Sequence, residues 1–284
     1  MPALDGKIVV ITGATSGIGL ATAEALATSG ARLVLLARDP AKGAAALARL
    51  KELNSACDAD VLYADLSRLD AVRKIAAALE ALPRLDVLVN NAGAIFNRRA
   101  ETEDRLERTF ALNHMNYYLL TRLLLPRLAA SAPARIVNVA SGAHRGAQLD
   151  FNDLQMARGY RGRTAYQRSK LCNILFTREL ARRIVDMGVT ANCLHPGFVA
   201  TGFGDNTDGL FRIALSIGKR LVAISPARGA ETVVYLATAP EVASKSGLYF
   251  GECRVETPST AARDDVAALK LWNESARIAG LPAA

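Results

Sequence analysis

Short, continuous apolar runs alternate with longer amphipathic segments along the chain. The runs are rich in Val, Ile and Leu, which is typical of strands buried on both faces of a parallel sheet. We expect strands at residues 7–11, 32–37, 61–66, 85–89, 134–140, 189–194 and 247–250. The segments between them predict helices at residues 20–29, 40–53, 103–125 and 226–238. A further helix is predicted after the third strand and ends at about residue 82. This alternation predicts an α/β fold with about seven parallel strands in one doubly wound sheet, covered by helices on both faces.

Length and composition agree with a single folded domain over residues 1–284. With 51% hydrophobic and 22% charged residues the chain can bury a sizeable core, and no repeat, linker or low-complexity tract interrupts the alternation. The net charge of +8 raises nucleic acid as a partner. Because the arginines are spread along the chain, solvated faces or attraction to an anionic cofactor explain the charge better, and no nucleic-acid partner is expected.

The cysteines and the start of the chain indicate the compartment. Cys57, Cys172, Cys193 and Cys253 form no CxxC pair, so neither a metal site nor a disulfide framework is predicted. The first apolar run begins within a few residues of Met1, which leaves no room for a signal peptide, and no run of about 18 apolar residues follows. We therefore expect a cytoplasmic protein with no membrane partner.

A glycine-rich loop follows the first predicted strand. Residues 12–19 read Thr-Gly-Ala-Thr-Ser-Gly-Ile-Gly and lead into an alanine-rich helix. Strand, glycine loop and helix are the context of a dinucleotide-binding (Rossmann) fingerprint, in which the backbone approaches a pyrophosphate at the helix N-terminus. The predicted cofactor contacts of the loop are Gly13, Thr15, Ser16, Gly17, Ile18 and Gly19.

The end of the second strand predicts which dinucleotide binds. An acidic residue there would hold the ribose 2′-hydroxyl of NAD, but this chain has Ala37 followed by Arg38. A guanidinium pairs with a 2′-phosphate, so NADP(H) is preferred over NAD(H). Asp39 can cap the next helix, and the alternative for Arg38 is a solvated loop residue.

Tyr166 and Lys170 are four residues apart in a segment compatible with a helix, and so lie on one face. A phenol has a reference pKa of about 10, and a neighbouring cation makes its phenolate accessible. The pair therefore predicts a proton-transfer centre. The alternative, for this segment alone, is an ordinary pair on a helix surface.

Several motifs together resemble the short-chain dehydrogenase/reductase family: the G-x-x-x-G-x-G spacing, Asn90-Asn-Ala-Gly93, Asn113, Ser141 after the fifth strand, and Tyr166 with Lys170. Features over nearly the whole chain resemble the retinol-dehydrogenase-like branch. They are the long connection between Ser141 and Tyr166, Asn113-His114, Ala143-His144, residues 171–180, residues 246–250 and residues 271–275. The membrane-anchoring N-terminal segment of many vertebrate relatives is missing, which argues against a retinoid substrate.

The resemblance implies four catalytic residues. Tyr166 would act as general acid in reduction and general base in oxidation, and Lys170 would lower its pKa and hold the nicotinamide ribose. Ser141 would donate a hydrogen bond to the substrate oxygen. Asn113 would hold a water that links Lys170 to solvent; the alternative is a buried helix asparagine that is satisfied by a kink or a water.

Further cofactor contacts are implied in the same way. Asp65 resembles the aspartate beside the adenine ring, although Asp65 or Ser67 could equally be a helix cap. His195 is interpreted as a strand-end residue, because no G-x-S-x-G elbow supports a hydrolase. The remaining implied contacts are Leu66, Asn91, Ala92, Gly93, Pro196, Gly197, Val199 and Thr201, besides Tyr166 and Lys170.

Residues 202–224 are glycine-rich and then amphipathic, which predicts a helical lid over the substrate. A helix packed on the core or a dimer contact are the alternatives. The predicted substrate contacts are Ser141, His144, Phe203 and Phe211.

The sequence therefore predicts an NADP(H)-dependent enzyme that interconverts a carbonyl and an alcohol on a small hydrophobic substrate, mainly as a reductase. A homodimer through the helices that carry Asn113 and Tyr166 is implied by the resemblance. Two alternatives remain: a non-catalytic dinucleotide sensor on the same fold, and a sugar-nucleotide epimerase or dehydratase, which also has a Tyr-x-x-x-Lys pair.

Overall fold

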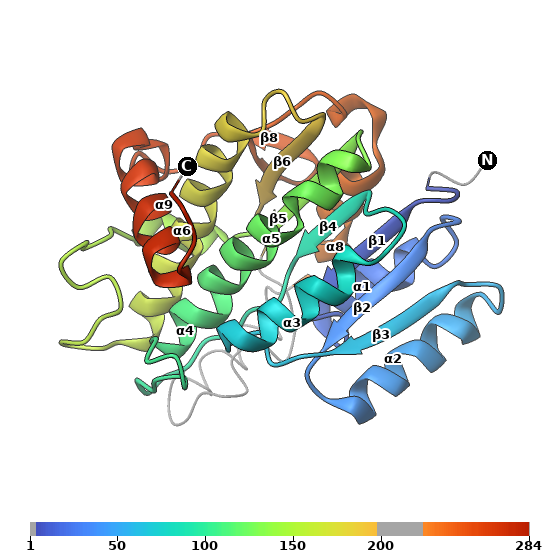
Figure 1. Ribbon diagram of the computed structural model, residues 1–284, viewed down its shortest axis with the longest axis horizontal. Helices are drawn as coiled ribbons and strands as arrows, with labels where there is room; N and C mark the ends of the chain where they lie inside the picture. The colour runs from blue at the N-terminus through green and yellow to red at the C-terminus, as the bar shows by residue number, and fades with distance from the viewer. Residues whose placement is uncertain (1–3, 198–223, 284) are drawn as a thin grey trace.

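The computed structural model describes residues 4–197 and 224–283 (Figure 1). Four predicted site residues, Val199, Thr201, Phe203 and Phe211, lie outside the described residues, as does nearly all of the predicted lid. The predictions made for them are not tested by the structure.

One sheet runs through the described part of the chain, with eight strands in the order β3-β2-β1-β4-β5-β6-β7-β8. The strands are β1 (Ile8–Thr12), β2 (Arg32–Ala37), β3 (Ala59–Tyr63), β4 (Val87–Asn90), β5 (Ala134–Val139), β6 (Val189–Leu194), β7 (Tyr249–Gly251) and β8 (Arg254–Glu256). The first seven are parallel, as predicted. The chain adds β2 and β3 on one side of β1 and then β4 to β7 on the other side, which is the arrangement of a doubly wound fold.

Strand β8 was not predicted, and it pairs antiparallel with β7. The turn between the two strands contains Glu252 and Cys253, both with positive φ, at 46° and 60°. Glycine or asparagine normally occupies such positions and is the usual sequence signal of a tight hairpin. Because this turn has neither residue, the hairpin left no such signal in the sequence.

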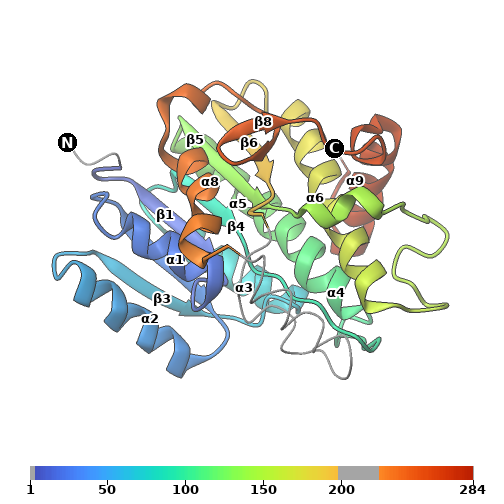
Figure 2. The same ribbon diagram turned by 180° about the vertical axis from the view of Figure 1, so that it is seen from behind.

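Helices cover both faces of the sheet (Figures 1 and 2). Helices α1 (Gly17–Leu26), α2 (Pro40–Leu53) and α8 (Pro226–Thr238) pack on one face, and α3 (Leu69–Glu80), α5 (Asn116–Ala130), α6 (Gly162–Arg183) and α9 (Asp265–Ala279) on the other. Alternate residues of the central strands supply the two cores: Val9 and Ile11 face α1, whereas Ile8 and Val10 face the other layer. No helix of residues 4–197 or 224–283 combines the length and apolarity needed to cross a membrane.

The helix predicted over residues 103–125 begins later, at Arg108, and continues to Ala130. Residues 103–107 are not helical; α4 (Arg108–Phe110) begins where the Glu107 carboxylate accepts the N–H groups of Thr109 and Phe110, each at 2.8 Å. A π-helical turn, η1 (Ala111–Met115), then joins α4 to α5, with the N–H of Asn116 bonded to the carbonyl of Ala111. The turn is one residue wider than an α-turn, and such turns are frequent at functional sites.

Helix α9 was not predicted as an element, and it packs along α6. Trp272 of α9 lies against Phe176 of α6 and Tyr118 of α5, with ring centroids 6.0 Å and 5.1 Å away. Ser275 of α9 shares a 2.8 Å hydrogen bond with His114 of the π-turn. Complete burial lowers the pKa of His114 to about 3, so this histidine is a neutral part of the core.

A buried chain of polar side chains links the central strands to the helices. Asn90 at the end of β4 donates to Thr121 of α5 (2.9 Å) and to Asn138 of β5 (2.8 Å). Asn138 in turn donates to Thr177 of α6 at 2.9 Å. A buried amide needs such partners, so the network specifies how β4 and β5 align with the two helices.

Asp86 anchors the opposite, amino-terminal edge of the sheet. Its side chain is 3% exposed, accepts the N–H of Ile8 at 2.9 Å and a hydrogen bond from Arg84, and pairs with Lys7 at 3.1 Å. Burial alone would raise the pKa of Asp86, but these partners outweigh it and lower the pKa. The folded protein therefore binds the proton less readily than the unfolded chain, and the resulting stability exists only above the unfolded pKa of about 4.

We predict that Asp86→Asn lowers the free energy of unfolding by about 1–3 kcal/mol at pH 7. The difference from the wild type should shrink as the pH falls below about 4, because protonation removes the same interactions from the wild type. Urea unfolding at several pH values measures this. The matched variant Asp60→Asn, at an exposed ion pair with Arg32, should change little. A pH-independent loss in Asp86→Asn would contradict the argument.

Candidate active site

The predicted site residues gather at the carboxyl-terminal edge of the parallel strands. The glycine loop follows β1, Asn91 to Gly93 follow β4, Ser141 lies just after β5, and Pro196 follows β6. Helix α6 carries Tyr166 and Lys170 to the same edge. In open α/β sheets ligands bind outside this edge, so the topology places the chemistry as expected.

The glycine loop has the geometry that a dinucleotide requires. Gly13 and Gly17 have φ of 65° and 54°, and α1 begins at Gly17. A Cβ on Gly13 would lie 2.9 Å from the Cα of Ala92, and one on Gly19 would lie 2.3 Å from the carbonyl oxygen of Gly13. Gly19 is therefore needed for close packing, while Thr15 to Ile18 reach the surface. The first N–H groups of α1 have no partner within the helix, and they point toward an approaching anion.

Thr12 ties the glycine loop to the segment after β4. Its hydroxyl accepts the N–H groups of Asn91 (2.8 Å) and Ala92 (2.9 Å), and the Asn91 side chain donates to the carbonyls of Thr12 (2.9 Å) and Gly13 (3.2 Å). Asn91 and Ala92 thus hold the walls of the cofactor site together. Thr12 was not among the predicted site residues. In the sequence, only its position between the first strand and the glycine loop could have singled it out.

Arg38 lies exposed at the end of β2, where the 2′-position of a bound ribose was predicted. The Oδ1 of Asp39 caps α2 by accepting the N–H groups of Ala41 (2.9 Å) and Lys42 (3.2 Å). Asp65 accepts both the N–H (3.0 Å) and the hydroxyl (2.7 Å) of Ser67. The cap predicted for Asp39 is confirmed, and Asp65 forms a turn ahead of α3.

Tyr166 is partly buried and hydrogen-bonded to Ser141. Ser141 is positioned by the short helix η2 (Gly142–Gly146), because its hydroxyl also accepts the N–H of Ala143 at 3.2 Å. Burial raises the pKa of Tyr166 to about 12, although the bond with Ser141 opposes the rise. The two side chains expected to contact the reacting oxygen therefore lie within hydrogen-bonding distance of each other.

Lys170 is 3% exposed and donates to the carbonyl of Val139 at 2.8 Å. Burial lowers its pKa to about 7, so ammonium and neutral amine coexist near neutral pH. The sequence predicted that Lys170 lowers the pKa of Tyr166. The structure does not show that effect: burial raises the pKa of Tyr166, and the Lys170 ammonium donates to Val139 and lies 5.8 Å from the centre of the Tyr166 ring.

Asn113 lies in the π-turn, and the structure gives it a well-defined set of partners. It exchanges two 2.9 Å hydrogen bonds with the backbone of Ala94 and donates to Ser169 at 2.9 Å. Ser169 donates onward to the carbonyl of Tyr166 at 2.8 Å. Asn113 therefore ties the segment after β4 to the turn of α6 that carries Tyr166 and Lys170, and the water predicted beside it stays a prediction. Ser169 is a further residue that the sequence did not single out.

Gly93 leaves open the space between the catalytic side chains. A Cβ at this position would lie 3.1 Å from the Oδ1 of Asn113 and 3.5 Å from the Nζ of Lys170. The glycine that ends the Asn-Asn-Ala-Gly segment is thus needed for the close approach of Asn113 to Lys170.

The structure favours a positioning role for His144 instead of the predicted substrate contact. The ring is fully buried; Nδ1 bonds the carbonyl of Ser141 at 2.7 Å and Nε2 accepts the N–H of Ser259 at 3.1 Å. Burial lowers its pKa. Since both ring nitrogens are occupied, His144 fixes the turn that carries Ser141 and has no free atom for a substrate.

His195 is a strand-end residue, as interpreted from the sequence. Its Nε2 pairs with Glu256 of β8 at 3.1 Å, its Nδ1 accepts the N–H of Gly197 at 3.3 Å, and its ring stacks on Tyr249. Pro196 and Gly197 follow at the sheet edge, and a Cβ on Gly197 would lie 3.0 Å from Ile224. Gly197 and Ile224 therefore lie beside each other.

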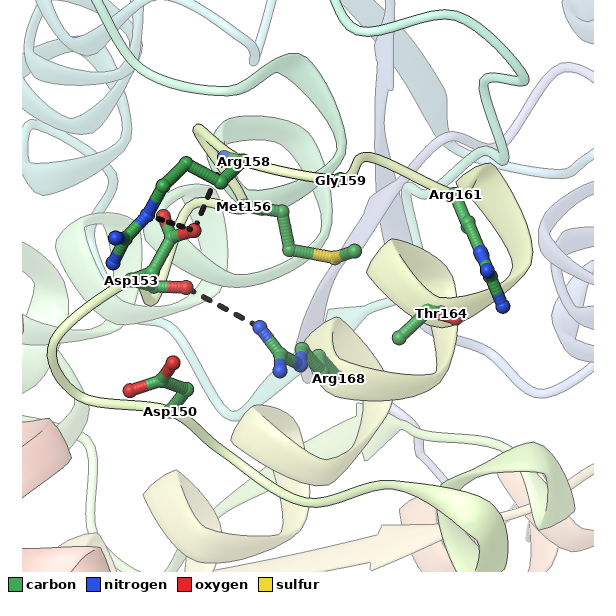
Figure 3. A pocket seen from close by; sticks show the side chains of 8 residues that line it. All are labelled: Asp150, Asp153, Met156, Arg158, Gly159, Arg161, Thr164 and Arg168. Carbon is green, nitrogen blue, oxygen red and sulfur yellow. Dashed lines mark hydrogen bonds and ion pairs between the residues drawn. The ribbon is translucent and has the colours of Figure 1, made fainter.

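A second hollow of about 410 Å³ lies between residues 150–161 and the first turns of α6 (Figure 3). Asp153 and Arg168 line it, and Arg168 donates to the Asp153 carbonyl at 3.2 Å. Thr164 and Arg168 lie two residues from Tyr166 on either side, so they face away from the Tyr166–Lys170 face of the helix. This hollow is therefore separate from the catalytic group.

Comparison with known proteins gives related chains. A family model described as short chain dehydrogenase matches residues 7–208. Human retinol dehydrogenase 14 is 41% identical over 298 residues, covering 98% of this chain and 88% of that protein. A structure of a putative uncharacterized protein from Mycobacterium paratuberculosis has a TM-score of 0.79 at 32% identity and covers 100% of this chain and 97% of that chain. The RhlG/NADP active-site complex of Pseudomonas aeruginosa has a TM-score of 0.70 at 27% identity, covering 92% and 99%.

We predict that Thr12→Val lowers the free energy of unfolding by about 1–3 kcal/mol and weakens dinucleotide binding, because two buried N–H groups lose their acceptor. Valine keeps the shape of threonine, so thermal melts and dinucleotide titrations measure the lost hydrogen bonds. The matched variant is Thr22→Val: Thr22 is also fully buried, but its hydroxyl has no partner among the described residues. That variant should be neutral or stabilising. Equal losses in both variants would contradict the role of Thr12.

Proposed function

Since the chain belongs to the short-chain dehydrogenase/reductase family and to its retinol-dehydrogenase-like branch, it is an oxidoreductase, and we propose that it reduces a small hydrophobic aldehyde or ketone with NADPH. The single observation that carries the proposal is the Tyr166–Ser141–Lys170 group at the carboxyl edge of the sheet, where a phenol lies beside a hydroxyl and a buried amine.

The residues that would hold the dinucleotide fit it chemically. The glycine loop and the N-terminus of α1 suit a pyrophosphate, Arg38 suits a 2′-phosphate, and Asn91 to Gly93 form the wall beside them. The Oδ1 of the neighbouring Asp39 caps α2, which gives this carboxylate a structural role beside Arg38. One structural relative, RhlG of Pseudomonas aeruginosa, is an active-site complex with NADP. When bound, NADPH supplies the hydride.

Tyr166 is the proposed general acid. With its pKa raised to about 12 it holds its proton at neutral pH, and it can give that proton to a carbonyl oxygen as the oxygen gains negative charge. Ser141 would donate its hydroxyl hydrogen to the same oxygen and stabilise the developing alkoxide. The turn held by His144 keeps Ser141 in place for this role.

Lys170 would stabilise the phenolate that Tyr166 leaves behind. An ammonium a few ångströms from the ring lowers the energy of the anion, and a site with little water strengthens that effect. Burial lowers the pKa of Lys170 to about 7, so its stabilisation of the phenolate should decrease as the pH rises through that region. Asn113, through Ser169, would keep the catalytic turn aligned.

A hydrophobic substrate is supported by the relatives. Human retinol dehydrogenase 14 is named for an apolar alcohol, and it is 41% identical over 98% of this chain. The substrate itself depends on residues outside the described part, including Phe203 and Phe211. The cytoplasmic location and the homodimer stay predictions.

We predict that Tyr166→Phe lowers carbonyl-dependent NADPH oxidation by about 100-fold or more, since the general acid is lost. A panel of aldehydes and ketones, followed by absorbance at the nicotinamide band, measures the rate. Dinucleotide affinity should change little, and Tyr63→Phe, which removes an exposed hydroxyl far along β3, should keep full activity. Undiminished turnover in Tyr166→Phe would exclude the mechanism. Dinucleotide binding without turnover of any carbonyl in the wild type would favour the sensor instead.

Arg38→Ala is expected to weaken NADPH binding by about 10- to 100-fold and to leave NADH binding nearly unchanged, because only the 2′-phosphate contact is lost. Fluorescence titration with both dinucleotides measures the two affinities. The control is Arg49→Ala, an arginine of α2 that pairs with Glu24 and should not affect either. An unchanged ratio of affinities in Arg38→Ala would rule out the assignment.

A further inference from the structure

We propose that Tyr117 is a positioning residue of this site: its ring face holds the Lys170 ammonium beside Tyr166, and its hydroxyl shares the Val139 carbonyl with that ammonium. The inference rests on the proposed function, and it adds a second tyrosine to the group. Tyr117 lies at the start of α5, four residues after Asn113. The π-turn that contains Asn113 leads directly into α5 and so helps to set the position of Tyr117.

Tyr117 and Lys170 share one acceptor. The Tyr117 side chain is fully buried, and its hydroxyl donates to the carbonyl of Val139 at 3.4 Å. The Lys170 ammonium donates to the same oxygen at 2.8 Å. A carbonyl oxygen has two lone pairs, so it can take both donors. The carbonyl thus brings the hydroxyl of Tyr117 and the ammonium of Lys170 together at the end of β5.

The ring of Tyr117 also faces the charge. The Nζ of Lys170 lies 5.5 Å from the centre of the Tyr117 ring and 5.8 Å from the centre of the Tyr166 ring. A cation within about 6 Å of an aromatic face is attracted by the ring quadrupole, and the attraction grows when water is excluded. Two phenol rings therefore compensate part of the cost of burying this ammonium.

The groups around Lys170 define what can titrate with it. Tyr117 from α5 and Tyr166 from α6 are the titratable side chains that face the amine in the described structure, while β5 contributes only the Val139 carbonyl and the segment after β4 contributes Gly93. Burial, and then the proximity of Tyr166, raise the pKa of Tyr117 well above its usual value. Tyr117 therefore stays protonated, and it donates a hydrogen bond without competing for the catalytic proton.

Loss of the ring has a consequence with a definite sign. A cation–π contact favours the charged form of Lys170 and so raises its pKa relative to a site without the ring. Without the ring, Lys170 should lose its proton at a lower pH. Since the ammonium supports the departure of the proton from Tyr166, carbonyl reduction should then fall off at a lower pH. The pH at which the rate of reduction falls is a property of the coupled Tyr166–Lys170 pair, not of one residue.

The test is the pH dependence of kcat for carbonyl reduction at saturating NADPH, from pH 6 to 10. Tyr117→Leu should move the alkaline limb to lower pH by about half a unit to one unit. Tyr117→Phe keeps the ring and loses only the hydroxyl, so its limb should move by less than half as much. If Tyr117→Leu gives no cooperative melt, Tyr117→Met, which fills the space without a ring, takes its place.

The control is Tyr118→Phe. Tyr118 is the next residue, also fully buried, but its hydroxyl accepts from Arg122 at 2.6 Å and lies in the cluster around Trp272. Its pH profile should match the wild type. A Tyr117→Leu limb that superimposes on the wild type or moves to higher pH overturns the proposal, as does an equal shift in Tyr117→Phe.

A direct titration separates this inference from the proposed function. In protein labelled with ¹³C-lysine, the Cε signal of Lys170, assigned by its loss in Lys170→Arg, should titrate at a lower pH in Tyr117→Leu than in the wild type. This measurement needs no substrate. An unchanged midpoint would overturn the role of Tyr117 even in an active enzyme, whereas a shifted midpoint in a protein that reduces no carbonyl would support it and reject the proposed function.

Discussion

The site depends on one buried ammonium group, the charge of which is opposed by its burial. Lys170 is 3% exposed, and its burial alone moves its pKa down to about 7. The carbonyl of Val139 and two phenol rings oppose that shift. Gly93 leaves the space for this arrangement, and Asn113 and Ser169 fix the turn of α6 that carries it. Much of the polar structure at this edge of the sheet therefore keeps a single charge beside a single phenol.

Much of the fold follows from the sequence because local signals agree with the tertiary structure. Helix α2 has the predicted bounds, since Asp39 caps it and Pro40 starts it. Strand β2 also has its predicted bounds, because a continuous apolar run fits a strand buried on both faces. The prediction failed where the decisive group is distant or unusual. Glu107 starts α4 by a side-chain cap after an irregular segment, and β8 follows a turn without glycine.

The residues of the site were predicted from the sequence, but only part of their roles was. Motif order identified Ser141, Tyr166 and Lys170, and the structure brings them to one edge of the sheet. The order of the motifs could not reveal roles that depend on contacts between distant parts of the chain. A hydroxyl such as Thr12 matters only because β4 ends beside it, 79 residues later in the chain. His144 could not be assigned either, because its two partners, Ser141 and Ser259, lie on separate segments. Roles that depend on such long-range partners do not leave a local signal.

The two edge strands of the described sheet affect how readily this protein aggregates. Strand β3 carries Asp60, paired with Arg32 of β2, and β8 is three residues long with Arg254 and Glu256 on it. An open edge offers unpaired backbone groups to another chain, and short strands and charged side chains discourage that addition. Edge-to-edge growth into fibrous aggregates is thereby opposed at both ends, so concentrated solutions of this protein should resist it.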